Sequence, residues 1–338
     1  MQPPPAQLGR REFLRLAGQA GAAALAASLG VHRALADVAA AGPAPVLRRT
    51  AVVAGRRPAS IVDAVGSTRV IEGLQVDPGR LQEMIETSLL ALADAPSPRI
   101  AWEKFVQPGQ VLLLKFSASL GASLGTEHAM LTALLYSLRA AGHEWGHIRV
   151  ADCAAARYFG GLNAGPVGWS EQTVKVTGQA EQLRRYLQGV DAIINVPCLS
   201  DHRLLGVSCA MENVTLPFIR RPGRYLGEPV HQAVLDIALD GMSARPVALT
   251  IVNAIRCVFD GGPTVTEATI MPLCEVWAST DVVALDTLGA DWLDSQRRRS
   301  GLAALAQADR APRYLELAQA AGLGNADLRH IVRRVHRV

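Results

Sequence analysis

Residues 190–213 read VDAIINVPCLSDHRLLGVSCAMEN, and this stretch decides the class of fold that we expect. Its first eight residues are mostly apolar, which is typical of a strand that helices cover on both faces of a sheet. The residues after Pro197 include cysteines, acids, a histidine and an asparagine. The stretch therefore predicts a central strand of an α/β sheet, followed by a polar loop at the mouth of that sheet.

Strand-like and helix-like segments alternate on both sides of this stretch. Short apolar runs typical of strands occur at residues 47–53, 109–117, 147–153, 246–255 and 274–280. Segments with the spacing of helices occur at residues 77–94, 126–138, 179–189, 230–239, 281–293 and 313–322. Such alternation is typical of α/β proteins. We predict a largely parallel or mixed sheet with helices on both faces, in one large domain that could divide into two lobes.

The N-terminus has the composition of an export signal. Arg10 and Arg11 precede an apolar run rich in alanine and glycine at residues 17–31, and together they resemble a twin-arginine signal. The run is too short and too mildly apolar for a stable membrane anchor. Residues 34–36 read Ala-Leu-Ala, which fits the small-residue cleavage rule, so we expect the mature chain to begin at Asp37. The alternative is an ordinary amphipathic helix.

This interpretation divides the chain into three parts. We expect residues 1–36 to be the signal peptide, residues 37–45 a linker, and residues 46–338 an α/β domain. The twin-arginine export machinery would then be a partner of the protein, and the periplasm its location. A small-molecule ligand is the other partner that we expect.

Removing the signal makes the protein nearly neutral. The whole chain carries a formal charge of +4, and residues 1–36 hold four arginines and one glutamate, a net of 4 − 1 = +3. The mature chain therefore carries 4 − 3 = +1, without the basic surface expected of a nucleic-acid-binding protein. Two basic runs, Arg297–Arg299 and the tail from Leu328, are expected to be solvated surface.

Cysteine and glycine patterns indicate no familiar cofactor. The five cysteines include no C-x-x-C pair, so neither an iron–sulfur cluster nor a zinc ribbon is indicated. The glycines at residues 159–169 lack the spacing of a dinucleotide-binding turn, and no Walker-type lysine motif occurs. The cofactor is therefore unknown, and a tightly bound metal is one alternative.

Polar residues stand at the ends of the predicted strands. They are Lys115, Ser117, Asp152, Cys153, Asn195, Asn253, Thr280 and Asp281. Because ligands of open α/β sheets bind beyond the carboxyl ends of the strands, we predict that these residues line one cavity. Asp281 has the alternative role of a helix N-cap, and Asp152 that of fixing a turn. His128, near a helix N-terminus, is a further candidate.

The polar stretch after Pro197 allows three interpretations. Cys198, His202, Cys209 and Glu212 are competent ligands for zinc, iron or copper, although their spacing is not a recognised ligand pattern. A pair of Cys198 and His202 could instead form a nucleophile, since an imidazole within hydrogen-bond reach lowers the pKa of a thiol. The third interpretation is a hydrogen-bonded polar turn that holds no ligand.

Six segments resemble, in order, the family called domain of unknown function 362 (DUF 362). They are VLLLKFS at 111–117, IRVADC at 148–153, residues 194–213, IVNAIRCVFDGGPT at 251–264, ASTDVVALDTLGA at 278–290, and RYLELAQAAGLG at 313–324. The resemblance extends from about Val46 to the C-terminus. It implies an α/β protein without a settled activity, often found in metal or iron–sulfur contexts. Some relatives carry a ferredoxin module, which we do not expect in this chain.

The chain also departs from the pattern of the family it resembles. Family members typically have lysines where this chain has Cys198, Ser200 and Glu212, and an acid where it has Asn253. The retained residues are Pro197, His202 and Asn213. An activity that needs those lysines should therefore not be carried over to this chain.

Two functions of different classes follow. The first is an exported enzyme, of redox or metal-assisted type, in which Lys115 orients the substrate and Asp152 and His202 act as acid–base groups or ligands. Its orienting and cofactor-binding residues would be Asn195, Asn213, Asn253 and Asp281. The second is a non-catalytic periplasmic accessory protein that binds a small molecule or a metal at the same site. The replaced lysines favour the second function.

Overall fold

The computed structural model describes residues 59–118, 120–241, 246–262 and 264–338. By their contacts, the residues divide into Met1–Pro45 and Val46–Val338, and every described residue belongs to the second unit. The predicted signal peptide, the linker and the predicted strand at residues 47–53 therefore lie outside the described residues.

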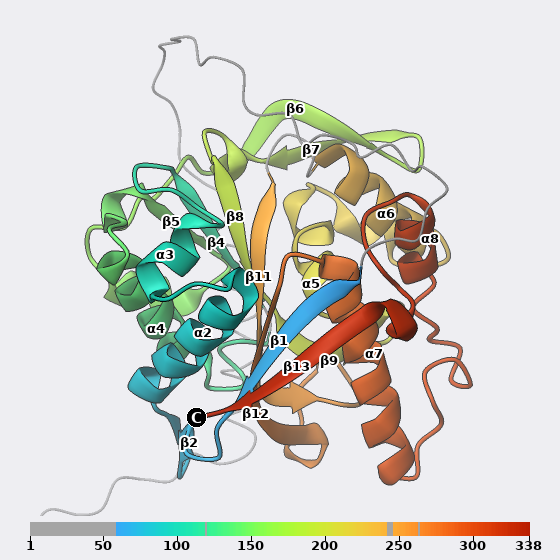
Figure 1. Cartoon of the computed structure of the whole chain (residues 1–338). Helices are drawn as coiled ribbons and strands as arrows, with labels where there is room; N and C mark the ends of the chain where they lie inside the picture. Colours follow the sequence, from blue (N-terminus) through green and yellow to red (C-terminus); the bar gives the residue numbers. More distant parts are fainter. Residues whose placement is uncertain (1–58, 119, 242–245, 263) are drawn as a thin grey trace, which may run out of the picture. The chain divides into compact units, whose positions relative to one another are not determined.

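One mixed sheet of nine strands forms the centre of the described chain (Figure 1). Its order is β13-β1-β12-β11-β8-β4-β5, with β9 paired to β11 and β10 paired to β9. The strands of this sheet are β1 (Ser60–Gly66), β4 (Leu112–Phe116), β5 (Ile148–Ala151), β8 (Ala192–Val196), β9 (Cys198–His202), β10 (Gly206–Ser208), β11 (Val247–Val258), β12 (Ile270–Ser279) and β13 (Ile331–Arg337). Two separate hairpins are β2 (Ile71–Glu72) with β3 (Gln75–Val76), and β6 (Trp169–Val176) with β7 (Gln179–Arg184).

Most strand pairs are parallel, and the predicted α/β class is confirmed. β13–β1, β11–β8, β11–β9, β8–β4 and β4–β5 run parallel, whereas β12 runs antiparallel to both of its neighbours. Because β4, β5 and β8 point the same way, their carboxyl ends meet at one edge of the sheet. The carboxyl end of β12 lies at the opposite edge.

Helices cover both faces of this sheet. The α-helices are α2 (Pro78–Ala93), α3 (Pro98–Glu103), α4 (Glu127–Ala140), α5 (Ala210–Asn213), α6 (Val230–Gly241), α7 (Val282–Arg299) and α8 (Tyr314–Ala320). The 3-10 helices are η1 (Trp145–His147), η2 (Ala154–Tyr158), η3 (Arg185–Leu187), η4 (Leu216–Phe218), η5 (Pro222–Tyr225), η6 (Glu267–Thr269) and η7 (Leu328–His330). α2, α3 and α4 pack on one face, and α5 to α8 with the β6–β7 hairpin pack on the other (Figure 1). No helix in the described part of the chain is long and apolar enough to span a membrane.

Local sequence signals place several helices as predicted. Asp77 caps α2 by accepting hydrogen bonds from the backbone N–H groups of Gly79 and Arg80, and a proline follows at the first turn. The predicted apolar face of α4 is buried, and it contains Met130, Leu131, Leu134, Leu135 and Leu138. Side-chain burial on this scale contributes about 1.5–3 kcal/mol per large apolar residue.

Pro197 divides a strand pair that the sequence predicted as a strand followed by a loop. β8 ends at Val196, and the chain resumes as β9 against the same long neighbour, β11. Proline has no N–H to give to the sheet, but its carbonyl still accepts from Asn253 N at 2.8 Å. The prediction of a loop was therefore wrong, because the twelve residues of β11 provide a pairing partner on both sides of the proline.

The helix predicted at residues 179–189 was also wrong. These residues form β7 and η3, in a hairpin with β6. The connecting residues Thr177 and Gly178 both have positive φ, which is the geometry of a two-residue hairpin turn. Glu181 points inward and is fully buried, where it contacts Arg221, Arg224 and Tyr225. Tertiary ion pairing therefore outweighs the helical propensity of this segment.

We expected the basic C-terminal tail to be solvated surface, and this expectation was wrong. It forms β13, at one end of the sheet order, beside β1 (Figure 1). Arg334 and His336 contact the fully buried carboxylate of Asp63, and Arg333 contacts Glu275 at 2.5 Å. The basic residues of the tail therefore neutralise acids that the sheet buries.

Candidate functional site

Lys115 lies at the centre of a buried polar cluster at the carboxyl end of β4. Its side chain is fully buried, and its Nζ donates to three acceptors: Phe116 O at 2.7 Å, Asn213 Oδ1 at 3.0 Å and Asp152 Oδ2 at 2.9 Å. An ammonium group has three protons to donate. Every proton of Lys115 is therefore used within the protein.

Asp152 is the member of this cluster that reaches solvent. It follows β5 directly, and Ala151 pairs with Lys115 in the sheet, so the fold brings the carboxylate to the ammonium. The backbone of Asp152 has a φ of 56°, a left-handed conformation that costs a non-glycine residue about 1 kcal/mol. Its side chain is 25% exposed. The carboxylate of Asp152 therefore contacts the buried ammonium of Lys115 and is also accessible to solvent.

Two asparagines complete the cluster. Asn213 Nδ2 donates to Asn195 Oδ1 at 2.8 Å and to Lys115 O at 3.0 Å. Asn195 Nδ2 donates to Ala210 O at 2.9 Å and to Thr250 Oγ1 at 3.3 Å. A buried polar network in which each group has a partner is rigid. Four predicted residues thus come together, and we call Lys115, Asp152, Asn195 and Asn213 the Lys115 cluster.

Asp286 holds the short helix α5 that carries Asn213. Its carboxylate accepts from Ala210 N at 2.5 Å, from Met211 N at 3.1 Å and from the Tyr314 hydroxyl at 2.7 Å. Complete burial outweighs these donors and raises the pKa of Asp286 to about 7. Sequence reasoning missed this residue. The available signal was an acid within the mostly apolar run VVALDTLGA.

Tyr186 was missed as well, because its segment was predicted to be a helix. Its hydroxyl is buried and has no hydrogen-bond partner among the described residues. Burial, and then the nearby carboxylate of Asp152, raises the pKa of this hydroxyl well above its usual value. An unpaired buried hydroxyl costs about 1–3 kcal/mol, so the burial of this group calls for an explanation.

Two other predicted residues do not join the cluster. Asn253 lies within β11, where its amide donates to Thr126 Oγ1 at 2.7 Å. Asp281 caps α7 by accepting from Val283 N and Ala284 N, both at 2.9 Å. The antiparallel direction of β12 places Asp281 at the opposite edge of the sheet. The prediction that all the strand ends line one cavity was therefore wrong for these two residues.

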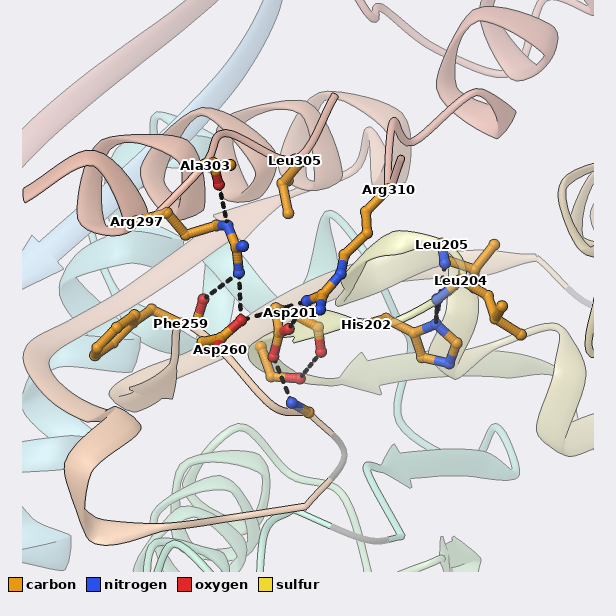
Figure 2. A network of polar contacts seen from close by, with 12 residues as sticks. Asp201, His202, Leu204, Leu205, Phe259, Asp260, Arg297, Ala303, Leu305 and Arg310 are labelled. Atoms are coloured by element: carbon orange, nitrogen blue, oxygen red, sulfur yellow. Dashed lines mark hydrogen bonds and ion pairs between the residues drawn. The ribbon is translucent and has the colours of Figure 1, made fainter. Parts of the chain in front are cut away.

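His202 supports a turn. Its Nδ1 accepts from the backbone N–H groups of Leu204 and Leu205, at 3.1 and 3.0 Å. In Figure 2 its ring lies toward these two leucines, away from the carboxylate of Asp201. Burial lowers the pKa of His202, and the carboxylates of Glu212 and Asp201 oppose that shift. At neutral pH a lowered pKa leaves the ring uncharged, which suits an acceptor of two N–H groups.

The residues proposed as metal ligands are not assembled into a ligand set. Among the described residues, no three His, Cys, Asp or Glu side chains are placed to hold a metal ion. Cys198 and His202 stand at the two ends of the extended strand β9, about 13 Å apart at about 3.3 Å per residue. Glu212 instead accepts from Ser208 Oγ at 2.9 Å.

The thiols of this stretch are also poor nucleophiles. Burial, and then Glu127, raises the pKa of Cys198 to about 12, and burial raises the pKa of Cys209 well above its usual value. Nucleophilic attack needs the thiolate. All five cysteines are unpaired with one another. The geometry of Cys198, His202, Cys209 and Glu212 therefore does not fit a metal or a nucleophile pair.

A second charged cluster includes Asp201, Asp260, Arg297 and Arg310 (Figure 2). Arg310 contacts the carboxylates of Asp201 at 3.0 Å and Asp260 at 3.3 Å, and Arg297 contacts Asp260 at 2.5 Å. Asp201 also accepts from Gly262 N at 2.6 Å. Arg297 is only 4% exposed, so the expectation of solvated surface was wrong for this arginine. We call these four residues the Asp201 cluster.

Two other features share no residue with the Lys115 cluster. A hollow of about 330 Å³ lies on the surface of α2 and α3, and it is lined by Gly79, Gln82, Glu83, Glu86, Thr87, Leu90 and Pro98. None of the predicted site residues lines it. His128 is exposed, and its ring lies 6.2 Å from that of Tyr158 and 5.6 Å from that of Phe159. It therefore belongs to an aromatic group.

The described residues thus form an α/β protein whose predicted polar residues gather in part at the carboxyl ends of its parallel strands. Residues 137–291 match the model of the family described as Domain of unknown function (DUF362). This match confirms the family resemblance for the sequence segments that lie within residues 137–291. No curated protein matches the chain.

Proposed function

We propose that the protein is a non-catalytic, exported small-molecule-binding protein whose ligand contacts the carboxylate of Asp152. The observation that carries this proposal is the bonding of Lys115. Its three protons go to Phe116 O, Asn213 and Asp152, so no proton is left to orient or activate a substrate. The buried ammonium of Lys115 holds the partly exposed carboxylate of Asp152 in place. A hydrogen-bond acceptor held in one position suits ligand recognition.

The ligand test uses protein isolated from the exporting cell and analysed by native mass spectrometry. We expect an additional small-molecule mass on the wild type, lost in Asp152→Asn and kept in Glu83→Gln. Glu83 lines the hollow on α2 and α3, so it is a matched control for binding elsewhere. A ligand that survives Asp152→Asn and disappears in Glu83→Gln would place binding at the hollow and sink the proposal.

A metal- or redox-assisted enzyme is the second candidate, and Tyr186 favours it. Its buried hydroxyl has no partner among the described residues and feels the charge of Asp152, so it is a group that could donate a hydrogen bond to a bound molecule. The test follows the mass of the copurified molecule with time. Conversion by the wild type and none by Tyr186→Phe would support an enzyme. Elemental analysis of the same preparation tests the tightly bound metal.

Export through the twin-arginine pathway is part of the proposal. It rests on Arg10, Arg11 and the apolar run that follows them. The test is fractionation of cells that produce the full chain with Arg10→Lys and Arg11→Lys together. We expect the wild type in the periplasmic fraction and the double variant in the cytoplasm. Equal distribution of the two proteins would contradict this route of export.

A further inference from the structure

We propose that Asp286 is the positioning residue of the Lys115 cluster: it fixes α5, and α5 fixes Asn213 between Lys115 and Asn195. Asp286 lies on α7, and its hydrogen-bond partners among the described residues are Ala210, Met211 and Tyr314, so it acts on Lys115 and Asp152 only indirectly. Its relevance to ligand binding rests on the proposed function. The positioning itself does not.

The helix α5 is too short to hold its own geometry. It has four residues, and a first helical turn is unfavourable without outside support. The backbone N–H groups at a helix start have no partner within the helix. Cys209, in the N-cap position, makes no side-chain capping bond. Asp286 takes this role from 76 residues away, by accepting from Ala210 N and Met211 N.

Asp286 can act in this way because its own position is fixed. α7 is 18 residues long, and it packs closely on the strands that precede α5. A Cβ on Gly289 would lie 2.9 Å from a methyl group of Leu199, so a larger residue there would require the Leu199 side chain to shift. The Tyr314 hydroxyl, on α8, donates a further hydrogen bond to the carboxylate at 2.7 Å. A rigid long helix thus anchors a short one.

The consequence for the cluster follows from the place of Asn213 at the end of α5. At about 1.5 Å rise per residue, it lies only about 5 Å along the helix from the residue that Asp286 caps. Its side chain accepts from Lys115 and donates to Asn195 and to Lys115 O. If α5 moves, Lys115 loses one of three acceptors, and the ammonium that fixes Asp152 becomes less constrained.

The charge state of Asp286 should therefore affect the cluster. The titratable groups that act on it are Tyr314 from α8, Glu212 from α5 and Cys209 just before α5. Three donors point at its carboxylate, which matches the ionised form with its several acceptor positions. A proton on the carboxylate turns one acceptor position into a donor. Because the pKa of Asp286 is raised to about 7, its carboxylate gains or loses this proton near neutral pH.

The test measures proton exchange in the folded protein by 1H–15N NMR, without any ligand. The signals observed are the Lys115 ammonium and the Asn213 side-chain amide, both buried and hydrogen-bonded in the wild type. In Asp286→Ala we expect exchange of both to be at least tenfold faster, and in Asp286→Asn an intermediate change. Tyr314→Phe removes one bond to Asp286 but leaves both bonds to α5, so it is the matched control.

A purely structural role of Asp286 predicts a different result. It would lower the melting temperature in Asp286→Ala and leave both exchange rates equal to those of Tyr314→Phe, which would overturn the proposal. If Asp286→Ala does not fold, the wild type alone decides: the Asn213 amide shift must titrate together with the Asp286 carboxyl carbon between pH 6 and 8. Independent titration contradicts the proposal. Failure to find a ligand affects neither outcome.

Discussion

The Lys115 cluster and the Asp201 cluster both contain buried opposite charges, but they differ in which charged side chains reach solvent. In the Lys115 cluster the cation is fully buried and an acid, Asp152, reaches solvent. In the Asp201 cluster the fully buried Asp201 contacts Arg310, which is 24% exposed, and the buried Arg297 contacts Asp260, which is 30% exposed. The second cluster ties β9 to the loop after β11 and to the segment before α8. The first presents a fixed acceptor, whereas the second closes loops on the sheet.

This comparison shows that a polar sequence stretch need not form a single site. Asn195 and Asn213 lie within residues 190–213 and build the Lys115 cluster. Asp201 and His202 lie in the same stretch and hold structural contacts. Side chains alternate between the two faces of a strand, so neighbours in sequence are directed to different environments.

The largest expected effect is that of Lys115→Met. Removing one partner of a buried ion pair costs about 3–5 kcal/mol, and here Asn213 and Phe116 O lose a donor too. Urea unfolding measures the change, with the exposed Lys175→Met as the control. A loss below about 1 kcal/mol would show that the cluster does not depend on this ammonium.

The second effect concerns the pH dependence of stability through Asp286. Its pKa is raised from 3.8 to about 7 in the folded protein, so folding takes up a proton between these values. The free energy of unfolding should therefore fall as pH rises from about 4 to 7, by up to about 4 kcal/mol, and then level off. Asp286→Asn should lack this part of the decline. Parallel stability curves for the two proteins would show that Asp286 does not titrate in this range.

Arg310→Met should have a smaller effect than Lys115→Met. It leaves the buried carboxylate of Asp201 with Gly262 N as a donor, but Arg310 is partly exposed and its loss is screened by solvent. We expect a loss of about 1–3 kcal/mol in urea unfolding. Arg313→Met, at an exposed and loose pair with Asp309, is the control. A loss larger than that of Lys115→Met would reverse the comparison of the two clusters.

His202→Ala should have the smallest effect on stability. Two backbone N–H groups in a partly buried turn lose their acceptor, which costs about 1–2 kcal/mol, while ligand binding should not change. Thermal unfolding and native mass spectrometry measure the two quantities. His128→Ala, at an exposed position, is the control. Loss of the ligand in His202→Ala would show that this histidine belongs to the binding site.

The sequence predicted the architecture well where local signals agree with the tertiary structure. The apolar spacing of α4 and the Asp-Pro start of α2 are local, and both helices form as predicted. The segment that became β7 has helical propensity, but a hairpin turn and the buried ion pairs of Glu181 decide its structure. Such long-range contacts cannot be inferred from spacing alone.

The candidate site was predictable only in part, for a related reason. Lys115, Asp152 and Asn195 follow parallel strands, and the rule of carboxyl ends brought them together correctly. The same rule failed for Asp281, because the direction of β12 is set by its neighbours in the sheet. Asp286 was missed because a capping bond to α5 spans 76 residues.

The most direct test of the central claim is a crystal structure of the protein isolated from the cell that produces it, without removal of any bound small molecule. The account predicts density for a small molecule within about 3.2 Å of a carboxylate oxygen of Asp152, with Lys115 still bonded to Asn213. Density in the hollow on α2 and α3, or a molecule bonded to Lys115 in place of Asn213, would contradict it.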